Sequence, residues 1–206
     1  GAAAISNTAN ATIDGVISGG HNLTKAGAGV LTLARDNTYA ATNVDAGTLS
    51  VSSDSNLGSG AITLAAGTTL AINGATTIDN AIALMGATTI SSTANATIDG
   101  VNSGAHNLTK TGAATLTLAA NNTYSGNTIV SAGGLTLTGG SSIGDGSAVS
   151  VASGATLTLG GGSETIGSLL GDGNVVLGYN LTMGGNNAST TFSGVISGTG
   201  NGITKI

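Results

Sequence analysis

The feature that most constrains this chain is a long internal repeat. Residues 6–25 (SNTANATIDGVISGGHNLTK) recur almost unchanged as residues 91–110 (SSTANATIDGVNSGAHNLTK), so equivalent positions differ by 91 − 6 = 85 in number. The spacing persists downstream, where the triplet LTL at 31–33 recurs at 116–118, and it then slips by only one or two residues. A third copy starts near Asn186. Self-similarity of this length predicts a repeat architecture rather than an ordinary globular domain.

The repeat also predicts the domain organisation. We expect residues 1–206 to be a single β-helix fragment, with repeat units at 1–85 and 86–180 and a truncated unit at 181–206. The small slips in spacing belong in loops, which tolerate insertions better than strands do.

Short strands are the expected secondary structure. Each recurring triplet is apolar, small polar, apolar, which is the period-two pattern of a strand with two side chains facing inward. Gly, Asn, Asp, Ser and Thr separate the triplets, as in residues 54–60 (DSNLGSG), and favour turns. Four triplets per unit indicate rungs of about 20 residues, and stacking them about 4.8 Å apart predicts a parallel β-helix of nine or ten rungs, roughly 45 Å long.

Two other folds share some of these features. An antiparallel sandwich also uses short strands separated by turn signals, but it needs no long-range repeat and usually fills its core with aromatic residues, which make up 2% of this chain. Leucine-rich repeats require a helical half, and no stretch of the chain keeps helical apolar spacing over two turns. The parallel β-helix is therefore the preferred fold.

Composition excludes several functions. Only four residues are basic, Lys25, Arg35, Lys110 and Lys205, and the sequence pI is near 4.4, so we expect no nucleic-acid binding. Cysteine is absent, so neither disulfides nor thiolate metal sites are available. No apolar run approaches the roughly 18 residues of a membrane span, and residues 1–10 lack signal-peptide features, so we expect no membrane contact within this segment and targeting parts outside it.

Several motifs resemble a known family. Residues 27–33 (GAGVLTL) with Asn37-Thr-Tyr39, residues 112–118 (GAATLTL) with 122–126 (NTYSG), and the stretches 46–51 and 131–137 resemble the autotransporter-associated β-strand repeat. Residues 161–178 resemble the linking rungs of such passengers, so the resemblance covers nearly the whole chain. It implies the passenger domain of a type V secretion protein, a right-handed parallel β-helix exported across the outer membrane. Neither a C-terminal membrane barrel nor a globular effector insert is recognisable here.

Candidate sites were sought among the titratable residues. His21 and His106 occupy equivalent places, and we expect them to be exposed turn residues stacked along one face, too far apart to share a metal ion. Asp14 and Asp99 are also equivalent, whereas the remaining acids are scattered: Asp36, Asp45, Asp54, Asp79, Asp145, Glu164 and Asp172. Scattered acids in turns are expected to be local acceptors for backbone amides.

The remaining motifs also favour structural roles. Gly144-Asp-Gly146 and Gly171-Asp-Gly173 lack the nonapeptide spacing of calcium-binding repeats. Ser168 has no triad-like context, and residues 160–162 (GGG) open no helix that could bind phosphate. Outward Thr32, Ser50 and Thr63 would form a polar ladder, able to contact carbohydrate or ice, if their faces coincide. We therefore predict no catalytic residue, no metal ligand and no cofactor.

The predicted function is that of a non-enzymatic secreted or surface-displayed passenger segment, a rigid stalk or adhesive surface at the bacterial outer membrane or outside the cell. Its partner would be a cell-surface or matrix molecule. The alternative is an extracellular structural fibre that self-associates through the ends of its β-helix, since uncapped rungs present free backbone groups. A polysaccharide-degrading β-helix enzyme is a weaker alternative, because such enzymes need clustered carboxylates.

Overall fold

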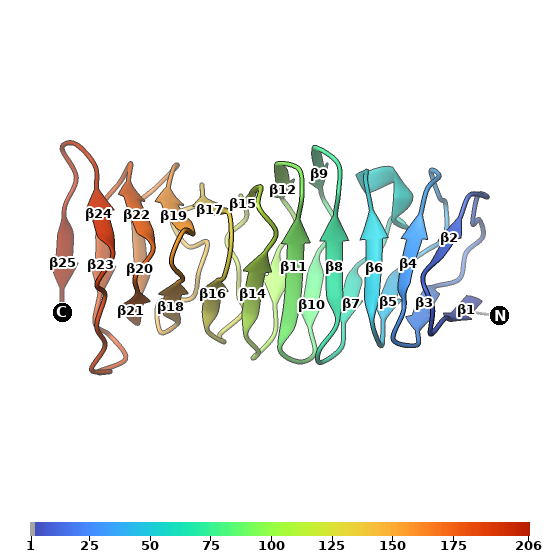
Figure 1. Cartoon of the computed structure of the whole chain (residues 1–206), viewed down its shortest axis with the longest axis horizontal. Helices are drawn as coiled ribbons and strands as arrows, with labels where there is room; N and C mark the ends of the chain where they lie inside the picture. The colour runs from blue at the N-terminus through green and yellow to red at the C-terminus, as the bar shows by residue number, and fades with distance from the viewer. Residues whose placement is uncertain (1–2) are drawn as a thin grey trace.

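The chain winds into one elongated coil of short strands. The computed structural model describes residues 3–206, and Figure 1 shows the strands following one another along a rod from the N-terminal to the C-terminal end. Every strand pair in the described part of the chain is parallel. The prediction of a parallel β-solenoid with about ten turns is confirmed, and the antiparallel sandwich is excluded.

Two sheets run through the N-terminal and central turns. Sheet I has six strands: β1 (Ala3–Ser6), β3 (Leu23–Ala26), β5 (Thr42–Val44), β7 (Ile62–Leu64), β10 (Ile82–Leu84) and β13 (Asn102–Ser103). Sheet II has nine: β2 (Ala11–Ile13), β4 (Val30–Leu33), β6 (Thr48–Val51), β8 (Thr69–Ile72), β11 (Thr88–Ser92), β14 (Leu108–Thr111), β16 (Thr128–Val130), β18 (Ala148–Val151) and β21 (Ser168–Gly171).

The other two sheets begin later in the chain. Sheet III has seven strands: β9 (Thr76–Ile78), β12 (Ala96–Ile98), β15 (Thr115–Leu118), β17 (Gly134–Leu137), β19 (Thr156–Leu159), β22 (Asn174–Leu177) and β24 (Val195–Ser197). Sheet IV has three: β20 (Glu164–Ile166), β23 (Leu181–Met183) and β25 (Ile203–Lys205). The one helix within residues 3–206 is a 3₁₀ helix, η1, which covers Asp54–Asn56.

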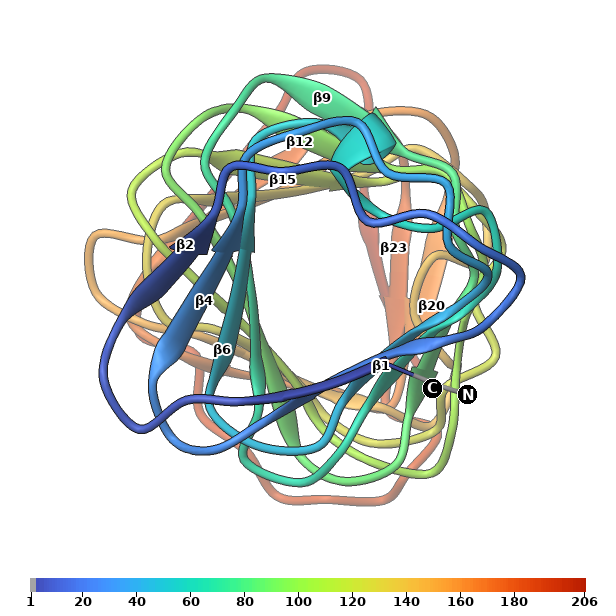
Figure 2. The same cartoon turned by 90° about the vertical axis from the view of Figure 1, so that its right-hand side faces the viewer.

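The coil has three sides. Figure 2, viewed along the rod, shows β2, β4 and β6 on one side and β9, β12 and β15 on the next. In chain order, β20 of sheet IV follows β19 of sheet III and precedes β21 of sheet II, which is the place that sheet I holds in the earlier turns. One turn therefore visits sheet II, sheet III and then sheet I or IV.

The interior is a column of aliphatic side chains. Leu31 pairs with Leu49, Leu49 with Leu70 and Leu70 with Ile90, and all four side chains are completely buried. This stacking follows from the apolar, polar, apolar triplets, because alternate side chains of a strand point to opposite faces. Each buried Leu or Ile contributes about 1.5–3 kcal/mol through burial, so stability accumulates turn by turn.

The sequence repeat does not coincide with a whole number of turns. Paired residues in neighbouring turns lie about 20 positions apart, as Ala3 and Leu23 do. Strand β3 of sheet I corresponds by sequence to β14 of sheet II, and β4 of sheet II corresponds to β15 of sheet III. Equivalent residues of the first two copies therefore lie four turns and one side apart.

The irregular segments shift in the same way. Sheet III begins at β9. In the turns before it, the same side of the coil is formed by the irregular segments 14–22, 34–41 and 52–61. Later, their counterparts 119–127 and 138–147 interrupt the side that sheets I and IV share. Residues that match in sequence thus face different directions. No helix within residues 3–206 has the length and apolar character needed to cross a membrane.

Candidate functional site

The outer face of sheet III carries a row of threonines. On sheet III five threonines, one per turn, lie in direct register: Thr77, Thr97, Thr117, Thr136 and Thr158. Parallel pairing spaces them about 4.8 Å apart, and the β-branched side chain of threonine is stiff at χ1. The result is a regular row of hydroxyl and methyl groups along the rod.

The ladder predicted from the sequence forms only in part. Thr32 pairs with Ser50 on sheet II, as expected. Thr63 instead lies on sheet I, where it pairs with Asn43 and Ala83, so its inclusion in the ladder is wrong. The physical reason is that the triplet of Thr63 forms β7 on sheet I, whereas the triplets of Thr32 and Ser50 form β4 and β6 on sheet II, the next side of the coil. Ser50 is also buried, and its hydroxyl accepts a hydrogen bond from Asn73 Nδ2 at 2.9 Å.

The two histidines are exposed, but they do not stack along one face. His21 precedes β3 of sheet I, whereas His106 precedes β14 of sheet II. The stacking predicted from their equivalent sequence positions is therefore wrong, because 85 residues span four turns and a further third of a turn. Within residues 3–206 no group of three or more His, Cys, Asp or Glu side chains is arranged to hold a metal ion.

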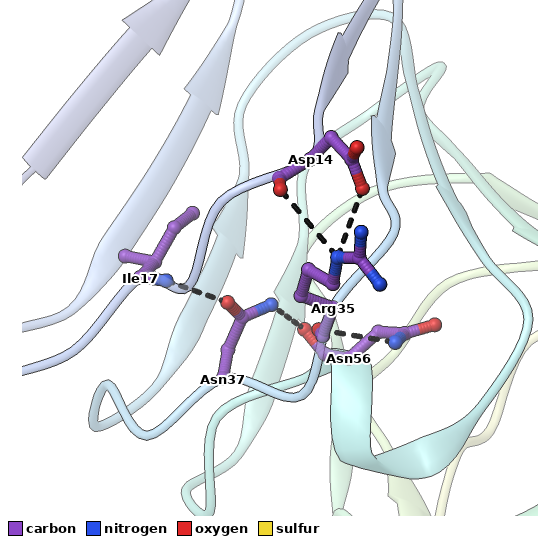
Figure 3. A network of polar contacts seen from close by, with 5 residues as sticks. All are labelled: Asp14, Ile17, Arg35, Asn37 and Asn56. Atoms are coloured by element: carbon purple, nitrogen blue, oxygen red, sulfur yellow. Dashed lines mark hydrogen bonds and ion pairs between the residues drawn. The ribbon is translucent and has the colours of Figure 1, made fainter.

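One ion pair joins scattered charges in the first copy. Arg35 Nε lies 2.9 Å from Asp14 Oδ1 in the preceding turn, and both side chains are largely exposed (Figure 3). In the second copy alanine, Ala120, stands at the place of Arg35, and Asp99 has no such cation. An exposed pair of this kind contributes little to stability.

An asparagine bridges three turns in each copy. Asn37 Oδ1 accepts a hydrogen bond from Ile17 N at 2.7 Å, and Asn37 Nδ2 donates to Asn56 O at 2.6 Å (Figure 3). Its equivalent, Asn122, accepts from Asn102 N at 2.7 Å and donates through Nδ2 to Ser142 O at 2.8 Å. No strand forms at this position, so the side-chain amide makes the inter-turn hydrogen bonds that the backbone of a strand would otherwise make.

Two lysines lie inside the aliphatic column. Lys25 stands between Ile5 and Val44 on sheet I, and Lys110 stands between Ile90 and Val130 on sheet II. Both are almost completely buried, and burial lowers the pKa of Lys25 and lowers that of Lys110 to about 8. A buried ammonium requires compensating hydrogen bonds.

Backbone carbonyls supply that compensation. Lys25 Nζ donates to Ala26 O at 3.0 Å, Gly27 O at 2.6 Å and Ala46 O at 3.0 Å, the last from the following turn. Lys110 Nζ donates in the same pattern to Thr111 O at 2.6 Å, Gly112 O at 2.9 Å and Ala132 O at 3.1 Å. We call these two arrangements the lysine clamps, because each ties a corner to the next turn.

The corner beside each clamp requires glycine. Gly27 and Gly112 both have φ of +79°, in the left-handed region that glycine alone adopts at little steric cost. A Cβ atom would lie 2.4 Å from Asn7 O at Gly27, and 2.2 Å from Ser92 O at Gly112. The backbones of successive turns therefore approach closely at this corner.

Three valines at equivalent positions are exposed. Val16, Val101 and Val195 each follow a glycine, and 64%, 41% and 61% of their surfaces are exposed. Single exposed apolar side chains are normal on protein surfaces, so what distinguishes these valines is their recurrence at equivalent positions and not their exposure alone. Like the histidines, Val16 and Val101 lie at different corners of the coil.

The faces are hollowed near the C-terminal turns. A groove of about 320 Å³ on sheet II is lined by uncharged residues, including Ile129, Ser150, Leu170 and Thr190. A larger hollow of about 790 Å³, which includes Met183, Phe192 and Lys205, lies beside it at the last turn. Neither is lined by a cluster of titratable groups.

Sequence reasoning missed the clamps and Glu164. Glu164 was expected to be a local acceptor in a turn, but it begins strand β20, is buried, and accepts hydrogen bonds from the amides of Ser142 and Ile143 in the preceding turn. A signal for the clamps was present, since Lys25 and Lys110 occupy an inward position of their triplets.

Comparison with known proteins agrees with the fold and the repeat. The model of the passenger-associated transport repeat matches residues 23–51 and 108–137, which contain the two lysine clamps. The chain is 43% identical over 192 residues to the adhesin BmaC autotransporter of Brucella suis biovar 1 (strain 1330). That match covers 85% of this chain and 6% of the adhesin, so the chain spans a small part of this relative. No solved structure matches significantly.

The two matches lie where the sequence resemblance was strongest. They confirm the expected location, at the bacterial outer-membrane surface or outside the cell. The chain thus carries two copies of the passenger-associated transport repeat, at residues 23–51 and 108–137.

Proposed function

We propose that this chain is a non-enzymatic segment of a surface-displayed passenger that acts both as a stiff stalk and as an adhesive surface. The continuous aliphatic column supports the stalk role, because each turn is tied to its neighbours by parallel ladders and a buried core. The adhesive role is carried by one observation: an exposed valine recurs at Val16, Val101 and Val195. The relative that covers most of the chain is named an adhesin, which agrees with this proposal.

Three finer features belong to the same proposal. The coil is right-handed, because connections between parallel strands of one sheet are right-handed in about 98% of cases. The chain is a single β-helix fragment with units at 1–85, 86–180 and 181–206. Val16 and Val195 both lie where the chain passes from sheet II to the side of sheet III, whereas Val101 lies where it passes from sheet III to sheet I, so the valines are presented at two corners of the rod.

Adhesion of beads coated with the purified chain to cultured epithelial cells tests the adhesive role. The triple variant V16S, V101S and V195S should reduce adhesion at least fivefold while leaving the circular dichroism spectrum unchanged, because exposed substitutions rarely disturb a fold. The matched control is M85S, since Met85 is 63% exposed but has no counterpart in the repeat pattern. Equal adhesion of the triple variant and the unaltered chain would contradict the adhesive role of these valines.

Particle size in solution distinguishes a stalk segment from a self-associating fibre. A stalk segment should keep one mass in light scattering from about 1 to 100 μM, whereas self-association through uncapped rungs should raise the mass with concentration. Ordered filaments at the higher concentrations would favour the fibre over the stalk.

A further inference from the structure

Glu164 is the one acidic side chain that lies inside the coil in the described part of the chain. It begins β20, and only 1% of its surface is exposed. Its Oε2 accepts a hydrogen bond from Ser142 N at 3.0 Å and its Oε1 accepts one from Ile143 N at 3.3 Å. The carboxyl group therefore holds segment 138–147, in the preceding turn, against its own turn.

The corresponding segment of the first copy is held differently. There the amides of Asn56 and Leu57 donate to Ser53 O at 3.1 Å and Asp54 O at 2.9 Å, within and around η1. A threonine, Thr76, stands at the place of Glu164, and its hydroxyl accepts from Asp54 N at 3.1 Å. The second copy has no such helix, so the carboxyl group of Glu164 replaces the local hydrogen bonds.

Among residues 3–206, no cationic group accompanies this buried acid. The titratable groups that act on it are Tyr124 and Asp145, from the two preceding turns, while the residues beside it in the following turn, Asn180 and Leu181, are uncharged. Burial, with a smaller contribution from the negative charge of Asp145, raises the pKa of Glu164 to about 7 against the opposing effect of the amide donors. Burial also raises the pKa of Tyr124, which keeps that phenol neutral.

We propose that Glu164 is a pH-sensitive latch: when protonated it holds segment 138–147 closed, and its ionisation opens this segment while the remainder of the coil stays folded. The physical reason is that an ionised carboxylate without a cation gains more from water than two amides return. In the open segment the carboxyl group has the ordinary pKa of an exposed glutamate. Opening therefore releases a proton and is favoured as the pH rises.

Hydrogen exchange measured by mass spectrometry on the whole chain tests the latch. After correction for the intrinsic pH dependence of amide exchange, protection of peptides covering 138–147 should fall about 20-fold between pH 5.5 and 7.5, given a pKa of about 7 closed and 4.5 open. Peptides covering 52–61, held by η1, should change less than twofold and serve as the internal control.

Two variants make the test specific. E164Q keeps the size of the side chain but cannot ionise, so its protection at 138–147 should not depend on pH. D145N removes the negative charge that raises the pKa of Glu164, so the fall in protection should be smaller than in the unaltered chain. If E164Q does not fold, E164T supplies the residue of the first copy and should also give pH-independent protection.

The latch would be refuted by either of two results. One is equal protection of 138–147 at both pH values in the unaltered chain. The other is the same fall in E164Q or E164T as in the unaltered chain.

Discussion

In the first copy of the repeat, segment 52–61 contains the 3₁₀ helix η1, whereas in the second copy segment 138–147 contains no helix and depends on Glu164. Both segments follow the same kind of path between strands, and both bury an apolar side chain, Leu57 or Ile143. The first is held by hydrogen bonds within a few residues, with one added contact to the Thr76 hydroxyl, and the second by the Glu164 side chain some twenty residues later. Equivalent backbone can thus be stabilised mainly by local or mainly by inter-turn contacts, and only the second kind places a buried carboxyl group at the segment.

Other features are shared by both copies. The lysine clamps and the bridging asparagines keep the same partners despite their position on different sides of the coil. The two copies therefore share a framework of buried polar contacts and differ in how individual segments are held. Substitutions at shared and at differing positions distinguish the two.

The largest effect is expected at the lysine clamps. K110M and K25M keep the aliphatic stem but leave buried carbonyls without a donor, and we expect each to lower the free energy of unfolding by about 2–4 kcal/mol. Urea unfolding followed by circular dichroism measures this loss. Because the clamps are equivalent, the two losses should agree within about 1 kcal/mol. If K25M lowered the free energy of unfolding and K110M did not, the two copies would not share this framework.

A smaller effect is expected at the bridging asparagines. N122A removes a buried amide that also accepts from Asn102 Nδ2 at 2.9 Å, and we expect a loss of about 2 kcal/mol. N37A should cost about 1 kcal/mol, because Asn37 is only half-buried and lacks this third bond. The same urea titrations measure both, and a larger loss in N37A than in N122A would reverse our ranking of the copies.

The smallest effect is expected at the surface ion pair. A120R gives the second copy the counterpart of the pair between Arg35 and Asp14, and R35A removes it from the first. Each change should alter stability by less than about 0.5 kcal/mol, and added salt should diminish it. Thermal unfolding at low and high salt measures this, and a shift of several degrees in either variant would contradict a screened, exposed pair.

Much of the fold could be predicted because its signals are local and repeated. The triplets at 31–33 and 116–118 become strands β4 and β15, and their apolar residues enter the core as expected. The parallel direction follows from the repeat as well, since stacked turns of one chain run the same way. Neither result depends on knowing which turns are neighbours.

The side on which each residue lies could not be predicted in the same way. Thr63 and Thr32 share a triplet pattern, yet they face different directions, and His21 and His106 share a sequence context but lie at different corners. Their placement depends on the total path length of the loops around each turn. A slip of one or two residues in a loop leaves the triplets recognisable and changes which residues pair.

The sequence alone determined that this chain is a repetitive, strand-rich coil with an aliphatic interior and a passenger-type repeat, because period-two patterning and internal identity are read directly from neighbouring residues. Only the tertiary structure decided that 85 residues make four turns and a third, that Lys25 and Lys110 are clamped inside, and that Glu164 secures the turn before it. These features arise from contacts between residues about twenty positions apart, so they exist only once the turns have stacked.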